Sequence, residues 1–366
     1  MKPPRPADPQ RILVRATNWV GDAVMTLPAC AALRAACPQA RIAVLAKPWV
    51  AAVYQASPAV DEVLTFDAKG AHAGLAGLWR LSRELKARQY DWAVLWQNAI
   101  QAALIAWLAG VPVRLGYASD GRRLLLSHPV ARTPQVRAMH ETAYYLHILF
   151  EAGLLPEEPP AGGVRPVLEL SPHDQGWAQG FLAGQDLPAG PLYGCAPGAS
   201  FGPAKCWPAQ RFAAALKGLA SQAGATVLLF GSPAEAAATR AVAQGLEGLR
   251  VVDLAGRTGL AQALALLGRL DLFVTNDSGL MHAAAALGVP TVAVFGSTNP
   301  VTTAPLGPWV ELVRHPIECS PCLKPVCPTG DLRCFDSITP QEVAQAARGL
   351  LQRAPAAGAG QGAGQP

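Results

Sequence analysis

The chain has 366 residues and a formal net charge of +5, and 51% of its residues are hydrophobic whereas only 15% are charged. This composition excludes a disordered protein, and the length is sufficient for two domains with separate cores. The small positive charge is a weak indication of an anionic partner. No apolar run has the length of a membrane span, and residues 1–10 lack a signal-peptide core. We therefore expect a cytoplasmic protein whose eight cysteines are thiols or metal ligands rather than disulfides.

The first half alternates short apolar strands with helices, which is typical of an α/β domain with a parallel sheet. Helices are expected at 23–37 and at 140–155. Pro28 is the one residue of the first that disfavours a helix. Strands are expected at 11–15, 41–46, 60–66 and 90–96.

The Pro- and Gly-rich residues 156–166 have the composition of an interdomain linker. We therefore expect an N-terminal domain over residues 1–160 and a second α/β domain over 161–340. A short helix at 341–353 and a low-complexity tail at 354–366, expected to be disordered, complete the chain.

Residues 270–296 read as strand, tight turn, helix and strand. In a parallel sheet, ligands bind at the carboxyl ends of strands, where Asp277, Ser278 and Gly279 are expected. The free N–H groups of the following helix point to the same place and favour a phosphate. The alternative is that Asp277 or Ser278 merely caps the helix. His282 in this helix is a candidate ligand or a half-buried core histidine.

Two other predicted strand ends carry polar residues. Asn18 and Asp22 follow the first strand, where Asp22 is either a helix N-cap or a general base. Ser200 and Lys205 lie in PGASFGPAKCWP, where Lys205 is either an exposed surface lysine or a cation for a departing phosphate.

Residues 111–140 are strongly basic, with one acid, Asp120. A solvated basic face is the commoner cause of such a cluster, and a surface for a multiply anionic acceptor is the functional reading. The arginines are Arg114, Arg122, Arg123, Arg132 and Arg137.

Four of the eight cysteines lie close together in a Pro-rich segment, with the spacing C-x2-C-x4-C-x6-C. Such a cluster suggests a structural zinc site, although the spacing is neither that of a zinc ribbon nor that of a ferredoxin cluster. Free or redox-labile thiols are the alternative. The residues are Cys319, Cys322, Cys327 and Cys334.

The segments RILVRATNWVGDAVMTLP, PGASFGPAKCWP, VTNDSGLMHAAAALG and CSPCLKPVC together resemble the ADP-heptose–lipopolysaccharide heptosyltransferases of glycosyltransferase family nine, most of all the heptosyltransferase II members. The similarity extends from about Arg11 to Ile338. It implies a GT-B fold, with two Rossmann-like domains facing each other across a cleft. It also implies inverting transfer of L-glycero-D-manno-heptose from ADP-heptose to the first heptose of the lipopolysaccharide inner core.

The resemblance also implies roles for individual residues. Asp22 matches the catalytic aspartate, and Lys205 matches the phosphate-binding lysine. The donor set comprises Ser200, Glu235 near the ribose, Asp277, Ser278, Gly279, Leu280 and His282. The acceptor set is expected to comprise Asn18, Arg114, Arg122, Arg123 and Arg137. Cys206 departs from the family, which commonly has an arginine after the lysine.

The sequence leaves other functions open. No Asp-x-Asp pair occurs in the sequence, so we expect catalysis without a metal cofactor. A heptosyltransferase I that uses a Kdo acceptor is the nearest alternative, and a nucleotide-sugar epimerase is the second. A basic module that binds nucleic acid is disfavoured, because no aromatic-interleaved basic motif is present. The expected partners are ADP-heptose and the lipid A–Kdo–heptose acceptor, with possible peripheral contact at the cytoplasmic face of the inner membrane.

Overall fold

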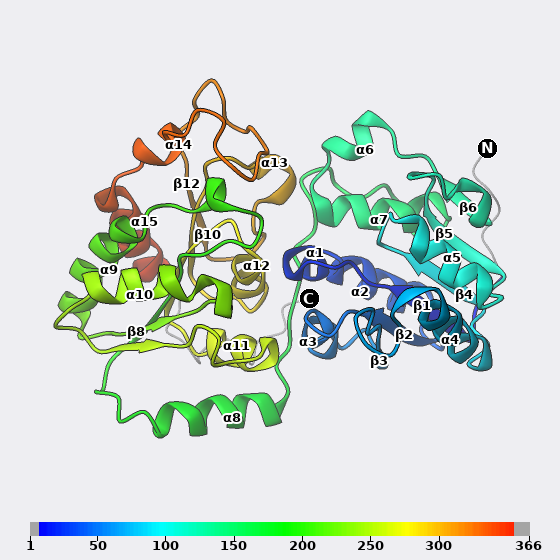
Figure 1. The fold of residues 1–366 in the computed structure, drawn as a ribbon, viewed down its shortest axis with the longest axis horizontal. Helices are drawn as coiled ribbons and strands as arrows, with labels where there is room; N and C mark the ends of the chain where they lie inside the picture. The colour runs from blue at the N-terminus through cyan, green and yellow to red at the C-terminus, as the bar shows by residue number, and fades with distance from the viewer. Residues whose placement is uncertain (1–6, 355–366) are drawn as a thin grey trace. The chain divides into compact units, whose positions relative to one another are not determined.

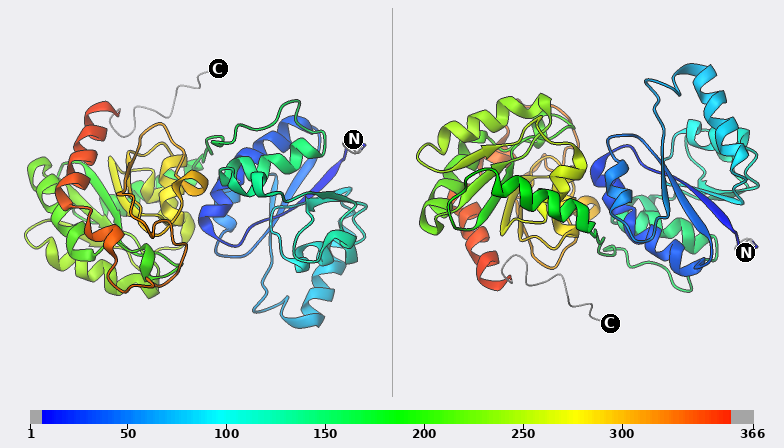
Figure 2. Two further views of the ribbon diagram at one scale, coloured as in Figure 1. Left: turned by 90° about the horizontal axis from the view of Figure 1, so that it is seen from above. Right: turned by 90° about the horizontal axis from the view of Figure 1, so that it is seen from below.

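The computed structural model describes residues 7–354, which divide between Glu169 and Leu170 into two compact units (Figure 1). Each unit contains a six-stranded sheet in which neighbouring strands run parallel. Figure 2 shows that helices cover both faces of each sheet. The predicted α/β class with two Rossmann-like domains is therefore confirmed. Beyond residue 354, the predicted tail lies outside the described residues.

The sheet of the first unit has the strand order β3-β2-β1-β4-β5-β6. Ile12 of the central strand pairs with Ile42 on one side and with Trp92 on the other, and all three are buried. Strands buried on both faces require near-continuous apolar runs, which these segments supply. The strands are β1 (Arg11–Arg15), β2 (Arg41–Ala46), β3 (Glu62–Thr65), β4 (Trp92–Leu95), β5 (Val113–Tyr117) and β6 (His128–Val130).

The helices of the first unit pack in two groups, because α2 contacts α7 whereas α4 contacts α5. The single helix expected at 23–37 is two helices separated at Thr26. Pro28 lies in the first turn of the second helix, where a missing N–H costs no hydrogen bond. The helices are α1 (Val20–Met25), α2 (Leu27–Ala36), α3 (Ala51–Gln55), α4 (Gly74–Ala87), α5 (Ile100–Leu108), α6 (Pro134–Ala138) and α7 (Glu141–Glu151), with a 3-10 turn η1 (Arg123–Leu125).

The sheet of the second unit has the order β12-β11-β10-β7-β8-β9, which is the same topology as in the first unit. Its central strands β7 and β10 pair directly, with Phe273 opposite Gly194. The strands are β7 (Leu192–Ala196), β8 (Thr226–Leu229), β9 (Val251–Asp253), β10 (Leu272–Asn276), β11 (Thr291–Val294) and β12 (Val310–Val313).

The helices of the second unit include α9, which packs against both α10 and α15, and α11, which packs against α8. No helix within residues 7–354 is long and apolar enough to cross a membrane. The helices are α8 (Pro172–Ala183), α9 (Ala209–Ala223), α10 (Ala236–Gly245), α11 (Leu260–Leu267), α12 (Gly279–Ala286), α13 (Pro300–Thr303), α14 (Arg333–Asp336) and α15 (Pro340–Arg353), with 3-10 turns η2 (Pro203–Lys205) and η3 (Pro233–Glu235).

The segment expected to be an interdomain linker is hydrogen-bonded to the first unit. The N–H of His140 donates to the carbonyl of Ala161 at 2.9 Å, and the N–H of Val164 donates to the Thr142 hydroxyl at 2.9 Å. Farther along, the N–H of Glu169 donates to the carbonyl of Ala56 at 3.0 Å. These bonds explain why the division between the units falls after Glu169, later than the boundary expected at residue 160.

Both sheets have a topological switch point, where the strand order reverses between neighbouring central strands. It lies between β1 and β4 in the first unit and between β7 and β10 in the second. Crevices at such points, beyond the carboxyl ends of the strands, are where open α/β sheets bind ligands. The loops that follow these four strands are therefore the places to look for a site.

Candidate functional site

The loop after β7, residues 197–208, is fastened to the end of β10 by one buried side chain. Asn276 accepts a hydrogen bond from the N–H of Trp207 at 2.9 Å, and its amide donates to the carbonyl of Pro197 at 2.7 Å. Asn276 therefore holds both ends of this loop, which we call the phosphate loop after the role expected for Lys205 from the sequence. A fully buried amide needs its hydrogen bonds satisfied, so the side chain fixes the position of the loop.

Lys205 in the phosphate loop forms an ion pair with the first residue after β10. Its Nζ lies 2.9 Å from Asp277 Oδ2, and the two side chains are 16% and 6% exposed. Within the described residues, Asp277 Oδ2 has no aligned hydrogen-bond donor, so the contact is an ion pair without hydrogen-bond geometry. The Lys205 ammonium also lies 5.6 Å from the centre of the Phe201 ring. The lysine is thus placed at the switch point rather than extended into solvent.

Ser278 is the N-cap of α12. Its hydroxyl accepts the N–H of Met281 at 3.3 Å and lies 3.2 Å from the Thr275 hydroxyl. The capping role considered from the sequence is therefore present. The partly exposed residues Gly279 and Leu280 precede Met281 in the same helical turn, where N–H groups are available to an anion. His282 is buried in the same helix.

Glu235 approaches the phosphate loop from the turn after β8. One of its carboxylate oxygens accepts the N–H of Ser232 at 2.8 Å and caps the 3-10 turn η3. A Cβ on Gly198 would lie 2.5 Å from the other carboxylate oxygen, so any other residue there would displace the Glu235 side chain from this position. Ser200 is exposed on the same loop. The predicted donor residues thus come from the ends of three strands, β7, β8 and β10.

Asn18 and Asp22 of the first unit follow β1, at the other switch point. Asp22 lies in the first turn of α1, partly exposed, and the N-cap position belongs to Trp19. Asn18 accepts a hydrogen bond from Arg15 at 3.2 Å. Arg15 is 2% exposed, and burial lowers the pKa of its guanidinium to about 10. Through its hydrogen bonds Arg15 fixes the start of the loop that follows β1. We did not predict this role, because an arginine at the end of a strand carries no special sequence signal.

Glu141, the first residue of α7, is electrostatically coupled to Asp22. Burial, and after it the negative charge of Asp22, raise the pKa of Glu141 to about 7. The positive charge of Arg132 opposes this shift. Helices α1 and α7 pack together, which explains the coupling. Glu141 was not predicted from the sequence, since its proximity to a residue so distant in the chain follows only from the fold.

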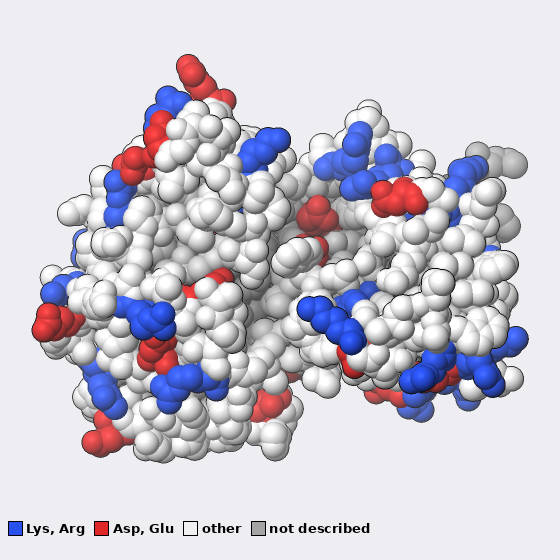
Figure 3. Space-filling view, viewed as in Figure 1, with Lys and Arg blue, Asp and Glu red and all other residues white. Residues whose placement is uncertain are grey.

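The basic stretch separates into buried and exposed arginines. Arg122 is fully buried and donates to the Tyr117 carbonyl at 2.8 Å and to Asn98 Oδ1 at 3.1 Å, and burial lowers its pKa to about 10. Arg114 donates to the Leu125 carbonyl at 2.6 Å. Arg123, Arg132 and Arg137 are exposed. Figure 3 shows basic side chains gathered around α6.

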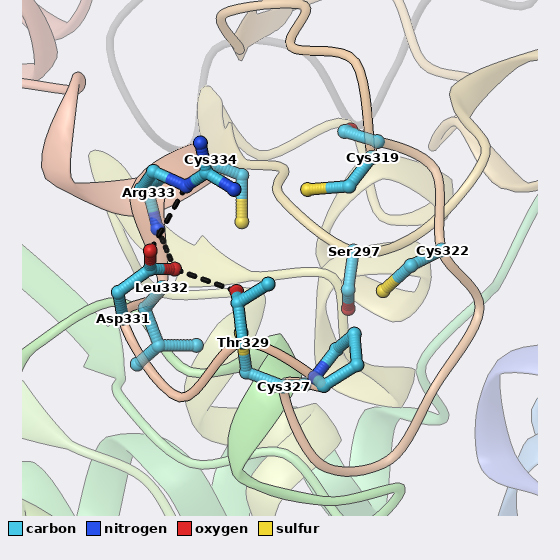
Figure 4. A pocket seen from close by; sticks show the side chains of 12 residues that line it. Ser297, Cys319, Cys322, Cys327, Thr329, Asp331, Leu332, Arg333 and Cys334 are labelled. Atoms are coloured by element: carbon cyan, nitrogen blue, oxygen red, sulfur yellow. Dashed lines mark hydrogen bonds and ion pairs between the residues drawn. The ribbon is translucent and has the colours of Figure 1, made fainter.

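The four clustered cysteines line one small pocket (Figure 4). However, no group of three or more His, Cys, Asp or Glu side chains in residues 7–354 is placed to hold a metal ion, so the zinc hypothesis is not supported. One thiol has another partner, because Cys327 Sγ lies 3.3 Å from the Thr329 hydroxyl. Hydrogen bonding, first of all from Thr329, lowers the pKa of Cys327 to about 7, whereas burial raises that of Cys334.

Comparison with known proteins identifies the family. The model of glycosyltransferase family 9 (heptosyltransferase) matches residues 78–332. Lipopolysaccharide heptosyltransferase 2 of Escherichia coli K12 is 31% identical over 354 residues, covering 93% of this chain and 98% of the relative. Lipooligosaccharide heptosyltransferase 2 of Haemophilus influenzae is 32% identical over 308 residues, covering 83% and 88%.

Solved structures agree with this result. The E. coli ADP-heptose lipopolysaccharide heptosyltransferase II has a TM-score of 0.77 at 30% identity, with 94% of this chain and 99% of that chain covered. The family 9 glycosyltransferase from Veillonella parvula has a TM-score of 0.84 at 24% identity, covering 96% and 100%, and shows the fold alone. The chain therefore belongs to glycosyltransferase family 9, the heptosyltransferase family, and is an enzyme with the GT-B fold.

Proposed function

We propose that the enzyme transfers L-glycero-D-manno-heptose from ADP-heptose to the first heptose of the lipopolysaccharide inner core, with inversion at the transferred carbon. The full-length similarity to proteins named lipopolysaccharide heptosyltransferase 2 supports this choice of substrates. The observation that carries it is the ion pair between Lys205 and Asp277 at the β7/β10 switch point, where Asp277 directly precedes Ser278, the N-cap of α12.

In this proposal the second unit binds ADP-heptose and stabilises the leaving ADP. When the bond between the sugar and the β-phosphate breaks, negative charge develops on the diphosphate. Lys205 and the amides of Gly279 and Leu280 supply positive potential for that charge, and their positions are fixed before the reaction. The carboxylate of Asp277 orients Lys205. Ser200 contacts the phosphates and Glu235 the ribose.

Asp22 is the proposed general base. It accepts the proton of the acceptor hydroxyl while that oxygen attacks the sugar carbon, and a single displacement of this kind inverts the configuration. Its place in the first turn of α1, beyond the carboxyl end of a central strand, and its partial exposure support the role. Water competes with the acceptor in such a reaction, so the bound substrates must exclude it.

The exposed arginines are proposed to bind the anionic acceptor. Arg123 and Arg137 are exposed on the surface, and their planar guanidinium groups can donate paired hydrogen bonds to carboxylates and phosphates. Arg132, also exposed, extends this surface. Arg114 and Arg122 donate instead to backbone carbonyls of η1 and β5, so their contribution to acceptor binding is to shape the surface. We place the reaction at the cytoplasmic face of the inner membrane, with peripheral contact through this surface.

The test is incubation of the enzyme with ADP-heptose and one of three additions: lipopolysaccharide truncated after the first heptose, lipopolysaccharide truncated at Kdo, or no acceptor. Mass spectrometry of the products should show one heptose added to the first acceptor only, and NMR should show the inverted anomer. Addition to the Kdo acceptor would instead identify a heptosyltransferase I. Donor conversion without any acceptor would identify an epimerase.

A further inference from the structure

The four clustered cysteines line a pocket that reaches the phosphate loop, although the proposed reaction does not use them. The pocket that they line also includes Ala204, which precedes Lys205 in the phosphate loop. Figure 4 shows the sulfurs of Cys319, Cys322 and Cys334 pointing toward the centre of the pocket. Because all four cysteines line this one pocket, their thiols form one cluster.

The loop that carries three of these cysteines, residues 319–327, is hydrogen-bonded directly to the phosphate loop. The carbonyl of Pro325 accepts the N–H of Ala204 at 3.1 Å. Gly202, at φ +148°, is so close that a Cβ there would lie 2.4 Å from the same carbonyl oxygen. Pro325 lies between Cys322 and Cys327 in sequence. A change in the backbone between these two cysteines therefore moves the Pro325 carbonyl, to which the residue before Lys205 is hydrogen-bonded.

The cysteine loop has a second attachment, at the end of β11. The N–H of Leu323 donates to the carbonyl of Ser297 at 2.8 Å, and the Ser320 hydroxyl donates to the carbonyl of Gly296 at 2.6 Å. Because the loop is hydrogen-bonded both to the phosphate loop and to the end of β11, it cannot adjust freely when a new covalent bond forms within it. The strain must pass to its contacts, of which the Pro325–Ala204 bond is one.

We propose that this pocket is a covalent-modification site, at which a peroxide joins two of its cysteines in a disulfide, and that the disulfide displaces the phosphate loop and weakens binding of the nucleotide diphosphate. The second clause rests on the proposed function of the Lys205 site. The first clause depends only on the thiol cluster.

The chemistry balances with hydrogen peroxide as the oxidant. One cysteine thiolate attacks the O–O bond, which gives a sulfenic acid and releases hydroxide. A second thiol then attacks the sulfenic sulfur, which forms the S–S bond and releases water. Two thiols supply the two electrons, and the peroxide is reduced to two waters. Cys327 is the natural first nucleophile, because hydrogen bonding to Thr329 stabilises its thiolate.

The experiment treats the full-length reduced enzyme with stoichiometric hydrogen peroxide, blocks the remaining thiols and maps the peptides without reduction. ADP affinity is measured by calorimetry before oxidation, after it, and after reduction with dithiothreitol. We expect a disulfide between two of the four pocket cysteines, an ADP Kd at least fivefold higher, and recovery on reduction. A peptide map without a disulfide in the pocket would overturn the proposal, and so would a pocket disulfide that leaves the ADP Kd unchanged.

Two variants complete the test. The triple variant Cys319→Ser, Cys322→Ser, Cys327→Ser retains one pocket cysteine, so its ADP Kd should not respond to peroxide. The matched control Cys37→Ser, outside the pocket, should respond as the wild type does. A response in the triple variant would refute the assignment, and if that variant does not fold, the wild-type peptide map still decides. If the reduced wild type does not bind ADP at all, the proposed function fails, whereas the map still tests the oxidation site.

Discussion

Replacement of Lys205 by alanine tests the proposed diphosphate site most directly. In the structure its ammonium lies 2.9 Å from Asp277 Oδ2, and the aspartate side chain is only 6% exposed. The variant Lys205→Ala therefore has two effects on a bound diphosphate. It removes an attractive cation, and it leaves a nearly buried carboxylate without its counter-charge beside the phosphates.

The size of the effect follows from the distances and the exposure. Two unit charges about 4 Å apart interact by about 4 kcal/mol at an effective dielectric constant of 20, which is an upper limit here because Lys205 is partly exposed to water. Hydrogen bonds to charged groups contribute about 1.5–3 kcal/mol. We therefore expect a loss of about 2–3 kcal/mol in ADP binding, which corresponds to about a 30- to 150-fold higher Kd.

Calorimetric titration with ADP and with adenosine measures this loss. Adenosine has no phosphate, so its affinity should not change. The double variant Lys205→Ala, Asp277→Asn should bind ADP more tightly than Lys205→Ala alone, since the unpaired carboxylate is gone. Lys217→Ala, an exposed lysine of α9, is the matched control. An unchanged ADP Kd in Lys205→Ala, or an equal loss for adenosine, would refute the reasoning.

Three further predictions concern Asp22, Asn276 and Glu141. Asp22→Asn should lower kcat by roughly a hundredfold or more while ADP Kd stays constant, and wild-type turnover in this variant would exclude the base assignment. Asn276→Ala leaves the N–H of Trp207 and the carbonyl of Pro197 without their partner, so urea denaturation should show a loss of about 1–3 kcal/mol, together with weaker ADP binding. Glu141 has a raised pKa of about 7 in the folded state, so its contribution to stability is complete below pH 4.5 and is lost as the pH rises to about 7. The free energy of unfolding should fall by about 3 kcal/mol at most over this pH range. Glu141→Gln should remove this pH dependence. If the urea midpoints of the variant and the wild type change equally with pH, the prediction is wrong.

The fold was predictable from the sequence because buried parallel strands are nearly continuous apolar runs. The segments around β1, β2, β4 and β10 are such runs, and the helices between them show the expected periodicity. Helix α8 was missed, since PHDQGWAQGFLA has little apolar periodicity. Its start signals were nevertheless present: Ser171 caps the helix and Pro172 is its first residue.

The polar residues at the strand ends were also predictable, but their partners were not. Lys205 and Asp277 were each candidates, whereas their ion pair follows only from the adjacency of β7 and β10. Asn276 breaks an apolar run and so is visible in the sequence. Its contacts, however, are with Pro197 and Trp207, far away along the chain. Non-local pairing of this kind leaves no local pattern, and the position of Glu141 relative to Asp22 is a second example.

The attachment of residues 161–169 to the first unit has a practical consequence for dissecting the enzyme. A fragment ending at residue 160 would lose the carbonyl of Ala161, which accepts the His140 N–H, and the N–H of Val164, which donates to the Thr142 hydroxyl, so the start of α7, beside Glu141, would fray. A fragment ending at Glu169 retains those bonds. Where the two halves are expressed separately, the chain is best divided between Glu169 and Leu170.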